Sequence, residues 1–247
     1  MASIDKQNLI CFKNGVYDLI KHQFVERDAY EIVEGELSTG LDYVKYDPTS
    51  VDAVEINTYL SQVFTSAIMC EHIKDMMASI IDGTTQRYAH SALIFTGTGS
   101  NSRTTFLNLF KKALGDYACN VLPGSDDSDI QSAAKGRKLV VMNGYSRALT
   151  GSTTFDCCGR TVTKESTPLI MDCSHEELHY IIYDNPNINN NRLPAQIVYF
   201  ASLFVENPNP ERAIEFKIDT TICNKLDRWA ETLISMLITH HKTLKKN

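Results

Sequence analysis

Apolar residues recur along this chain with two different spacings, which indicate two kinds of secondary structure. A spacing of three to four residues between Val51 and about Asp82 predicts two amphipathic helices, and the same spacing predicts a long helix from about Thr221 to Leu244. Short uninterrupted apolar runs predict buried strands, and they cover residues 91–96, 138–142, 169–171 and 196–200. A further amphipathic helix follows the first of these runs and ends at Gly115.

Two short apolar runs between Leu9 and Leu19 are joined through Asn14-Gly15. An Asn-Gly pair is typical of a two-residue hairpin turn, because both central positions of that turn have positive φ. The sequence therefore predicts a β-hairpin near the start of the chain. Acidic, loop-like sequence then continues to about Ser50.

The alternation of strands and helices in the second part of the chain indicates an α/β fold. Its sheet is expected to be mostly parallel, with helices covering both faces. We expect three parts: a β-rich segment over residues 1–50, a small helical layer over residues 51–88 and a core over residues 89–247.

The composition is that of a globular protein. Of the 247 residues 43% are apolar, yet no apolar window approaches the roughly eighteen residues that a membrane-spanning helix needs. The first nine residues are polar and lack the apolar stretch of a signal peptide, so we expect a cytosolic or nuclear protein that is not secreted. The net charge of −6 argues against non-specific binding to duplex DNA, although it leaves room for a local basic pore.

The seven cysteines are scattered, which favours reduced and mostly buried thiols over a disulfide framework. Cys173, His175 and His179 resemble part of a zinc site, but no second Cys/His pair has ligand spacing. The simpler interpretation is a His pair on a helix face beside a buried Cys. The sequence therefore predicts no metal site.

The segment after the run at residues 91–96 has the context of a phosphate-binding loop. A strand, a Gly-rich turn and a helix in this order place backbone N–H groups and a helix N-terminus around an anion. The full pattern is G-x-x-x-x-G-K-[ST], and here it reads Gly97-Thr98-Gly99-Ser100-Asn101-Ser102-Arg103-Thr104. The first glycine and the final hydroxyl are kept, whereas Ser102 replaces the second glycine and Arg103 replaces the lysine.

Both replacements change the chemistry of the loop. A side chain where the backbone needs positive φ costs on the order of 1 kcal/mol or blocks the approach of the ligand. Arginine is longer, planar and forked, so it cannot reproduce the compact point charge of lysine at the β- and γ-phosphates. The candidate nucleotide-binding residues of this altered loop are Gly97, Gly99, Asn101, Ser102, Arg103 and Thr104.

The stretch from Phe95 to Leu109, followed by Leu114-Gly115-Asp116-Tyr117-Ala118, resembles the pox-type superfamily-three helicases, which form the C-terminal half of the primase–helicases of large DNA viruses. Their loop is G-x-G-x-N-G-K-S-T-F, and the helix after it ends in L-G-D-Y. Leu9 to Leu19 is similar to the F-x-N-G-V-Y-D segment that precedes their helicase core. The helices predicted between Val51 and Asp82 fall where the family has its helical collar, so the resemblance implies a collar over residues 51–88, and it fades after Met142. It implies an AAA+-like P-loop core that forms hexameric rings, hydrolyses ATP and threads DNA through a central pore.

When the family's catalytic positions are compared one at a time with this sequence, most of them lack the residue that ATP hydrolysis uses. The acidic residues that hold Mg²⁺ in the family correspond to Asn143-Gly144-Tyr145-Ser146, which contains no carboxylate. The family's γ-phosphate-sensing asparagine falls in the segment that here reads Asp172-Cys173-Ser174, which contains no asparagine. Arg192 is the candidate for the family's arginine finger. Arg160 and Lys164 fall where the family has its DNA-binding pore hairpin.

Three hypotheses follow. The first is a catalytically inactive structural or assembly protein of a large DNA virus, which needs no cofactor and forms oligomers with itself, a helicase-family protein or a virion protein. The second is a helicase that binds ATP and Mg²⁺ in viral DNA replication, with a carboxylate from Asp126, Asp127 or Asp129; the simpler interpretation of these aspartates is an acidic surface loop. The third is a DNA-binding module without ATPase activity. The expected location is the host cytoplasm or nucleus, as a viral factory, or the virion.

Overall fold

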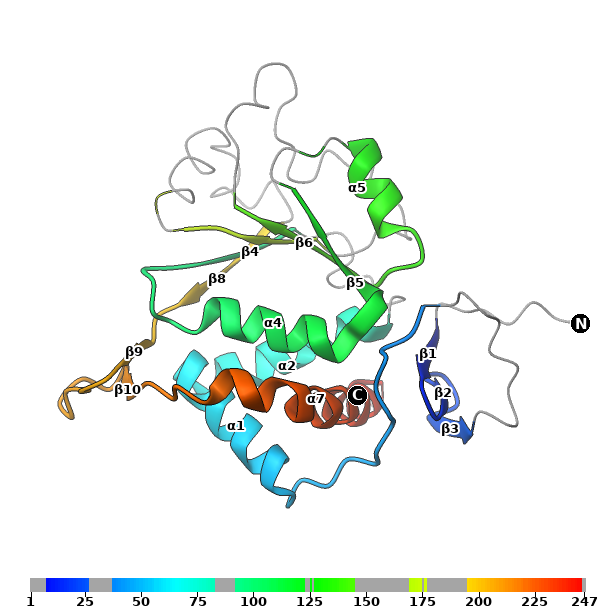
Figure 1. The fold of residues 1–247 in the computed structure, drawn as a ribbon, viewed down its shortest axis with the longest axis horizontal. Helices are drawn as coiled ribbons and strands as arrows, with labels where there is room; N and C mark the ends of the chain where they lie inside the picture. Colours follow the sequence, from blue (N-terminus) through cyan, green and yellow to red (C-terminus); the bar gives the residue numbers. More distant parts are fainter. Residues whose placement is uncertain are drawn as a thin grey trace, which may run out of the picture.

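The computed structural model describes residues 8–26, 37–82, 92–122, 125, 127–144, 169–174, 176 and 195–245. Figure 1 shows a sheet with a layer of helices beneath it and a small N-terminal sheet at one end. The N-terminal sheet is an antiparallel meander of β1 (Leu9–Phe12), β2 (Gly15–Asp18) and β3 (Gln23–Glu26).

The predicted hairpin exists, but the predicted position of its turn is wrong by one residue. Phe12 pairs with Gly15, so Lys13 and Asn14 form the turn and Gly15 already belongs to β2. Glycine is needed there for a different reason, because a Cβ at Gly15 would lie 2.5 Å from the Phe24 ring of β3. The pattern did not predict β3, since only its two central residues are apolar.

The two helices predicted after residue 50 are confirmed as α1 (Val51–Phe64) and α2 (Ala67–Asp82). Ser50 caps α1 by accepting a hydrogen bond from the Ala53 N–H through its side chain. Thr65 separates the two helices in a left-handed conformation with φ of 49°. Both helices pack against the long C-terminal helix α7 (Ile222–Leu244), which was also predicted.

The main sheet is five-stranded and parallel throughout, as the apolar runs predicted. Its strands are β4 (Ala92–Gly97), β5 (Ala118–Val121), β6 (Leu139–Asn143), β7 (Leu169–Asp172) and β8 (Ala195–Phe200), in the order β5-β6-β7-β4-β8. The edge strand β5 was not predicted, because Ala118-Cys119-Asn120-Val121 is not an apolar run. The order places the end of β4 between the ends of β7 and β8, and ligands of open parallel sheets bind where the strand order reverses in this way.

Helix α4 (Arg103–Leu114) lies beneath the sheet with α1, α2 and α7, whereas α5 (Asp127–Ala134) lies on the other side (Figure 1). Helix α5 corrects the prediction of an acidic surface loop at Asp127 and Asp129. Residues 127–134 form one short helix that contacts β5 and β6. These contacts stabilise a segment that is too short to be helical alone.

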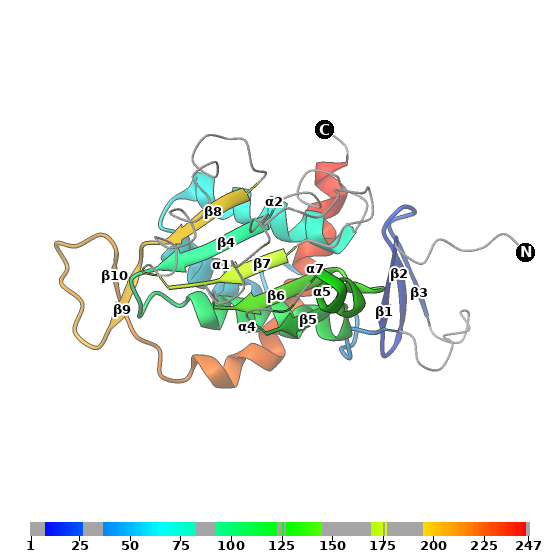
Figure 2. The same cartoon turned by 90° about the horizontal axis from the view of Figure 1, so that it is seen from above.

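A short parallel pair, β9 (Leu203–Val205) and β10 (Glu215–Lys217), follows the main sheet and was not predicted. Figure 2 shows the segment that joins these strands projecting from the body at the end opposite the N-terminal meander. The backbone N–H of Phe204 donates to the carbonyl of Ser100 at 2.8 Å, so β9 is attached directly to the loop after β4.

An aromatic cluster fills the space between the sheet and the helices. The Phe106 ring of α4 lies 5.2 Å from Phe64 and 5.9 Å from Phe200, measured between ring centroids, and all three side chains are buried. The same apolar core continues through α2 and α7, so one core supports the loop at the end of β4.

The two segments that carry the helicase resemblance outside the loop meet in space. The Tyr117 hydroxyl accepts a hydrogen bond from the Cys11 N–H at 3.0 Å, and the Asp116 N–H donates to the Ser38 carbonyl at 2.8 Å. Gly115 has φ of +54°, and a Cβ there would collide with the Thr39 carbonyl. We call this contact between residues 115–117 and residues 11 and 38–39 the N-terminal dock.

Candidate nucleotide-binding site

The loop Gly97–Ser102 joins the carboxyl end of β4 to the first turn of α4. Gly99, Ser100 and Ser102 all have positive φ, of 96°, 47° and 60°. Ser102, which replaces the second glycine of the phosphate-loop pattern, is thus still held in the left-handed region, and its side chain makes no capping hydrogen bond to α4. The backbone requires the conformation that glycine adopts at least cost.

The buried side chain of Asn101 stabilises the loop through two hydrogen bonds. It donates to the Phe200 carbonyl at 3.3 Å and accepts from the Arg103 N–H at 3.3 Å. A Cβ on Gly97 would lie 2.6 Å from the same Phe200 carbonyl, so this glycine allows β8 to approach closely. The side chain of Asn101 therefore uses one of the helix N–H groups that would otherwise face an anion.

Arg103, at the lysine position, is paired within the protein. Its Nε forms an ion pair with the carboxylate of Asp172, and its terminal nitrogen donates to the Cys173 carbonyl at 2.6 Å. The two charged side chains are only 17% and 12% exposed. The cation is thus directed toward the end of β7 and is neutralised there.

The sequence presented Arg103 and Asp172 as two separate departures from the helicase pattern, and it did not pair them. The available signal was complementary charge: a longer cation replaces lysine, while a carboxylate replaces the neutral asparagine. Only the parallel pairing of β7 with β4 brings the two positions together.

The geometry does not fit magnesium and a triphosphate. Strand β6 ends in Asn143, whose neighbour in the sheet register is Asp172, already paired with Arg103. Asp129 lies on α5, which packs against β5 and β6 away from β4. Within the described residues there is no group of three or more His, Cys, Asp or Glu side chains that could hold a metal ion. Thr104 is exposed at the start of α4.

Several predicted candidates lie outside the described residues: Asp126, Arg160, Lys164, His175, His179 and Arg192. The DNA-binding alternative depends on Arg160 and Lys164, so it stays a prediction. Cys173, the remaining member of the tentative zinc set, is buried, and its backbone N–H donates to the Phe95 carbonyl at 3.0 Å.

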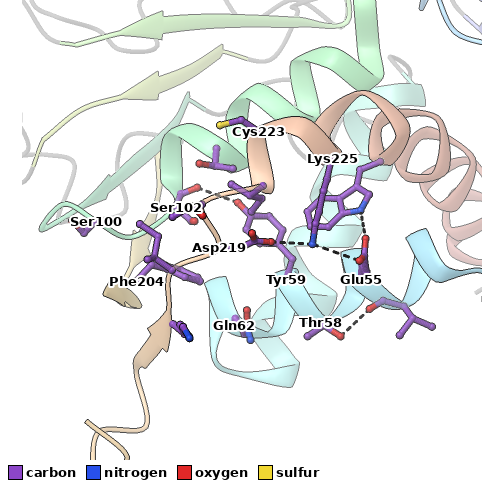
Figure 3. Close-up of a pocket in the computed structure, with 17 residues that line it drawn as sticks. Glu55, Thr58, Tyr59, Gln62, Ser100, Ser102, Phe204, Asp219, Cys223 and Lys225 are labelled. Atoms are coloured by element: carbon purple, nitrogen blue, oxygen red, sulfur yellow. Dashed lines mark hydrogen bonds and ion pairs between the residues drawn. The ribbon is translucent and has the colours of Figure 1, made fainter. Parts of the chain in front are cut away.

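A pocket of about 510 Å³ adjoins the loop (Figure 3). It is formed by α1, by the loop and the first turn of α4, by the segment from β9 and β10, and by the start of α7. Its lining includes Ser100, Ser102 and Thr105, and the hydroxyl of Tyr59, which also lines it, donates a hydrogen bond to the Ser102 carbonyl at 3.3 Å. Sequence reasoning missed this pocket because its walls are far apart in the chain, and apart from the loop they carry no motif.

Three charged side chains of the pocket, Glu55, Asp219 and Lys225, form a network of ion pairs. Lys225 bonds to Asp219 at 2.9 Å and to Glu55 at 3.5 Å, and Glu55 also accepts a hydrogen bond from the Trp229 indole at 2.9 Å. Hydrogen bonds from the Thr221 hydroxyl and from Lys225 lower the pKa of Asp219 to about 2. The indole hydrogen bond is the main reason that the pKa of Glu55 is also lowered. These charges hold α1 against α7.

The chain is similar to known proteins in part of its sequence and in its fold. No known family profile matches the chain. A protein of Acanthamoeba polyphaga mimivirus that carries the name helicase L207/L206 is 28% identical over 117 residues, which are 47% of this chain and 12% of that protein. The apo C-terminal region of NrS-1, residues 305–718, has a similar fold, with a TM-score of 0.52, 11% identity, and coverage of 93% of this chain and 65% of that one.

The chain is thus similar over about half of its length to a giant-virus protein named as a helicase, and its fold is similar to that of the NrS-1 region. The chain spans only a small part of the mimivirus protein and less than two thirds of the NrS-1 region. The similarity to NrS-1 concerns the fold, and it agrees with a parallel sheet whose β4 leads into a phosphate-type loop. In the part of the chain that the structure describes, no helix is long and apolar enough to cross a membrane.

Proposed function

We propose that this helicase-like chain is a degenerate member of the pox-type superfamily-three group that no longer hydrolyses ATP and serves a large DNA virus as a structural or assembly protein. The ion pair between Arg103 and Asp172 carries the proposal. It uses the cation at the lysine position to hold α4 against β7, so the charge is not directed at a phosphate.

Phosphoryl transfer depends on cations and a metal placed against the β- and γ-phosphates. To reach such a phosphate, Arg103 would have to leave both the Asp172 carboxylate and the Cys173 carbonyl. Asn143 at the end of β6 brings no negative charge for a metal. The lysine, the metal ligand and the sensor are therefore altered together, and a single compensating change cannot restore them.

The scaffold around this altered site is well packed. The apolar side of α4, including Phe106 and Phe110, is buried against the sheet and α7. A rigid core of this kind can present oligomer surfaces without turning over a nucleotide. We infer assembly with further copies, with a helicase-family protein or with a virion protein, in a viral factory of the host cytoplasm or nucleus or in the virion.

Phosphate release in the presence of ATP and Mg²⁺ tests the proposal. We expect release no faster than that of a Thr104→Ala control, in which the hydroxyl at the end of the loop pattern is removed. Saturable release that disappears in Thr104→Ala would contradict the proposal.

A variant that restores the helicase pattern at three positions provides a second test of the proposal. Ser102→Gly, Arg103→Lys and Asp172→Asn together free the lysine-position cation and relax the loop. We expect this variant to gain thermal stabilisation by ATP, whereas turnover should stay absent because Asn143 still supplies no carboxylate.

An ATP-binding helicase is the second candidate, and the loop backbone favours it. Gly99 and Ser102 retain positive φ, and the loop still adjoins an open pocket. Saturable stabilisation by ATP and Mg²⁺ together with turnover would establish this candidate in place of the first.

A further inference from the structure

A buried group of ionisable side chains lies where the N-terminal meander meets the last turn of α7, and Figure 1 shows the meander near that end of the helix. The carboxylate of Asp82, at the end of α2, is fully buried. It lies 3.1 Å from the ammonium of Lys245 and 3.3 Å from Nε2 of His241, which is itself only 1% exposed. The ring of His241 lies 5.8 Å from the ring of His22, measured between centroids. We call these four side chains the histidine cluster.

His22 connects the meander to this cluster. It lies in the turn between β2 and β3, where its φ is +52°. The carboxylate of Asp18 sets the shape of that turn, because it accepts hydrogen bonds from the N–H groups of Ile20 and Lys21, both at 2.9 Å. Leu19, in the same turn, is 1% exposed and belongs to the main apolar core. The turn therefore covers part of the core as well as contacting α7.

The charges of the histidine cluster are balanced only while both imidazole rings are neutral. Asp82 and Lys245 then carry one charge of each sign. Histidine side chains in water take up a proton at about pH 6.5, so acidification brings two further cations to the cluster. One buried carboxylate would then face three cations, and the two imidazolium rings would repel each other across 5.8 Å in a site from which water is largely excluded. Nδ1 of His241 is also buried and makes no hydrogen bond within the part of the chain that the structure describes, so an added proton there would have no acceptor.

The neighbouring ionisable groups do not supply the missing negative charge. In the turn, Asp18 is already paired with Lys21 at 3.3 Å. Burial acts to raise the pKa of Asp18, but hydrogen bonds from the turn outweigh burial and lower that pKa, so this carboxylate stays ionised while histidine titrates. On the two helices, Asp75 lies 2.7 Å from Nε2 of His240, and Lys242 in the last turn of α7 is a further exposed cation.

We propose that the contact between His22 and His241 is a pH-sensitive attachment, which holds the turn of the meander on α7 at neutral pH and releases it when both histidines are protonated. The sign follows from linkage, because the released turn binds protons as histidine in water does, whereas the attached cluster accommodates fewer protons. Falling pH therefore favours release. The N-terminal dock contains no histidine, so the meander stays bound there while release uncovers Leu19. The inference does not depend on whether the chain hydrolyses ATP.

Hydrogen exchange of the full chain at pH 7.5 and pH 5.5, resolved by NMR and corrected for the intrinsic effect of pH, tests this attachment. The readout is the protection of the N–H groups that pair β2 with β3. A sheet of three four-residue strands is marginally stable without packing against other elements, so loss of the contact with α7 should lower this protection. We expect a fall of about tenfold or more between pH 7.5 and pH 5.5 in the natural protein.

Two substitutions of His22 separate its charge from its place in the turn. His22→Gln is neutral at both pH values and should reduce the pH-dependent fall to less than about threefold, whereas His22→Arg is charged at both and should be poorly protected already at pH 7.5. The two variants are matched, because both side chains must adopt the same positive φ. His72→Gln, at an exposed position on α2, is the control and should retain the full fall of the natural protein.

Three results would overturn the inference: protection in the natural protein that does not change between the two pH values, a fall in His22→Gln as large as in the natural protein, or equal protection of His22→Arg and His22→Gln at pH 7.5. The second result would assign the acid response to other groups, and the third would show that a positive charge at this position does not weaken the attachment.

Discussion

The phosphate loop and the N-terminal dock both contain residues of the segments that carry the proposed resemblance to superfamily-three helicases, and they differ in how far those residues match the pattern. In the dock, Gly115 and Tyr117 match the family pattern and make the contacts that hold the N-terminal segment. In the loop, Ser102 and Arg103 depart from the pattern, although a strand, a turn with positive φ angles and a helix follow one another as the pattern predicts.

The residues that match the pattern are those needed for packing, whereas the residues that would contact a phosphate do not match it. Residues whose role is to let two backbones approach, such as Gly97 and Gly115, are retained in both regions. Residues whose role would be to contact a phosphate have changed, and Arg103 now joins α4 to β7 as part of the structure. A loop can therefore preserve its shape while its charged group takes a structural role, and measurements of stability can test that statement.

The largest effect is expected in the dock. Gly115→Ala should lower the free energy of unfolding by roughly 3 kcal/mol, because the new Cβ meets the Thr39 carbonyl in a backbone held at φ of +54°. Urea unfolding followed by the fluorescence of Trp229, the single tryptophan, measures the change.

Gly40→Ala is the control for that measurement. Gly40 also has positive φ, of +68°, but nothing lies within 4 Å of its Cβ position, so we expect a loss of only about 1 kcal/mol. Equal losses at both positions would show that the close contact in the dock contributes nothing beyond backbone strain.

The second prediction concerns the Arg103–Asp172 pair. Asp172→Asn or Arg103→Met should each destabilise the protein by about 2 kcal/mol, because each leaves a mostly shielded charge without its partner. The double variant should lose clearly less than the sum of the two, since the charges are then removed together.

The exposed pair between Lys112 and Asp227 serves as its comparison, and Lys112→Met should have a much smaller effect. If the Arg103 and Asp172 losses were simply additive, the pair would not be the structural link that distinguishes the loop from a phosphate site.

The third prediction extends the comparison to the pocket wall and depends on pH. The pKa of Asp219 is lowered to about 2 in the folded protein, so its stabilising contribution is complete above the usual value of 3.8 and disappears as the pH falls toward 2. Between these limits the natural protein should lose about 1 kcal/mol more than Asp219→Asn, a figure reduced for screening because the side chain is 41% exposed.

Urea midpoints measured across this acid range give the answer, with Asp42→Asn as an exposed carboxylate control. Parallel pH profiles for the natural protein and Asp219→Asn would mean that the hydrogen bonds from Thr221 and Lys225 do not stabilise the fold.

The smallest effect is expected at Ser102. Ser102→Gly should stabilise the protein by roughly 0.5–1 kcal/mol, because glycine adopts φ of 60° without the strain imposed by a side chain. Ser61→Gly, inside α1, should instead destabilise it by a similar amount. A loss at Ser102 would indicate that the serine makes a contribution that outweighs the strain.

Local pattern was sufficient for much of the fold. The spacing of apolar residues predicted α1, α2, α4 and α7, and the short apolar runs predicted β4, β6, β7 and β8 as members of a parallel sheet. It failed where tertiary contacts support weakly patterned segments, as in β3, β5, α5 and the β9–β10 pair. The turn at Asn14 was misplaced because Gly15 serves the approach of β3 and not a positive φ.

The sequence by itself determined that the phosphate loop lacks its lysine and second glycine and that Asn143 follows an apolar strand without a carboxylate, because these are properties of residue identity and order. Only the tertiary structure decided that Arg103 pairs with Asp172, since 69 positions of chain separate them and β7 must first align beside β4. The same reason applies to the pocket. It lies between α1 and α7, where the Tyr59 and Trp229 rings pack together, and side chains from distant segments share a surface only when the core has brought their helices together.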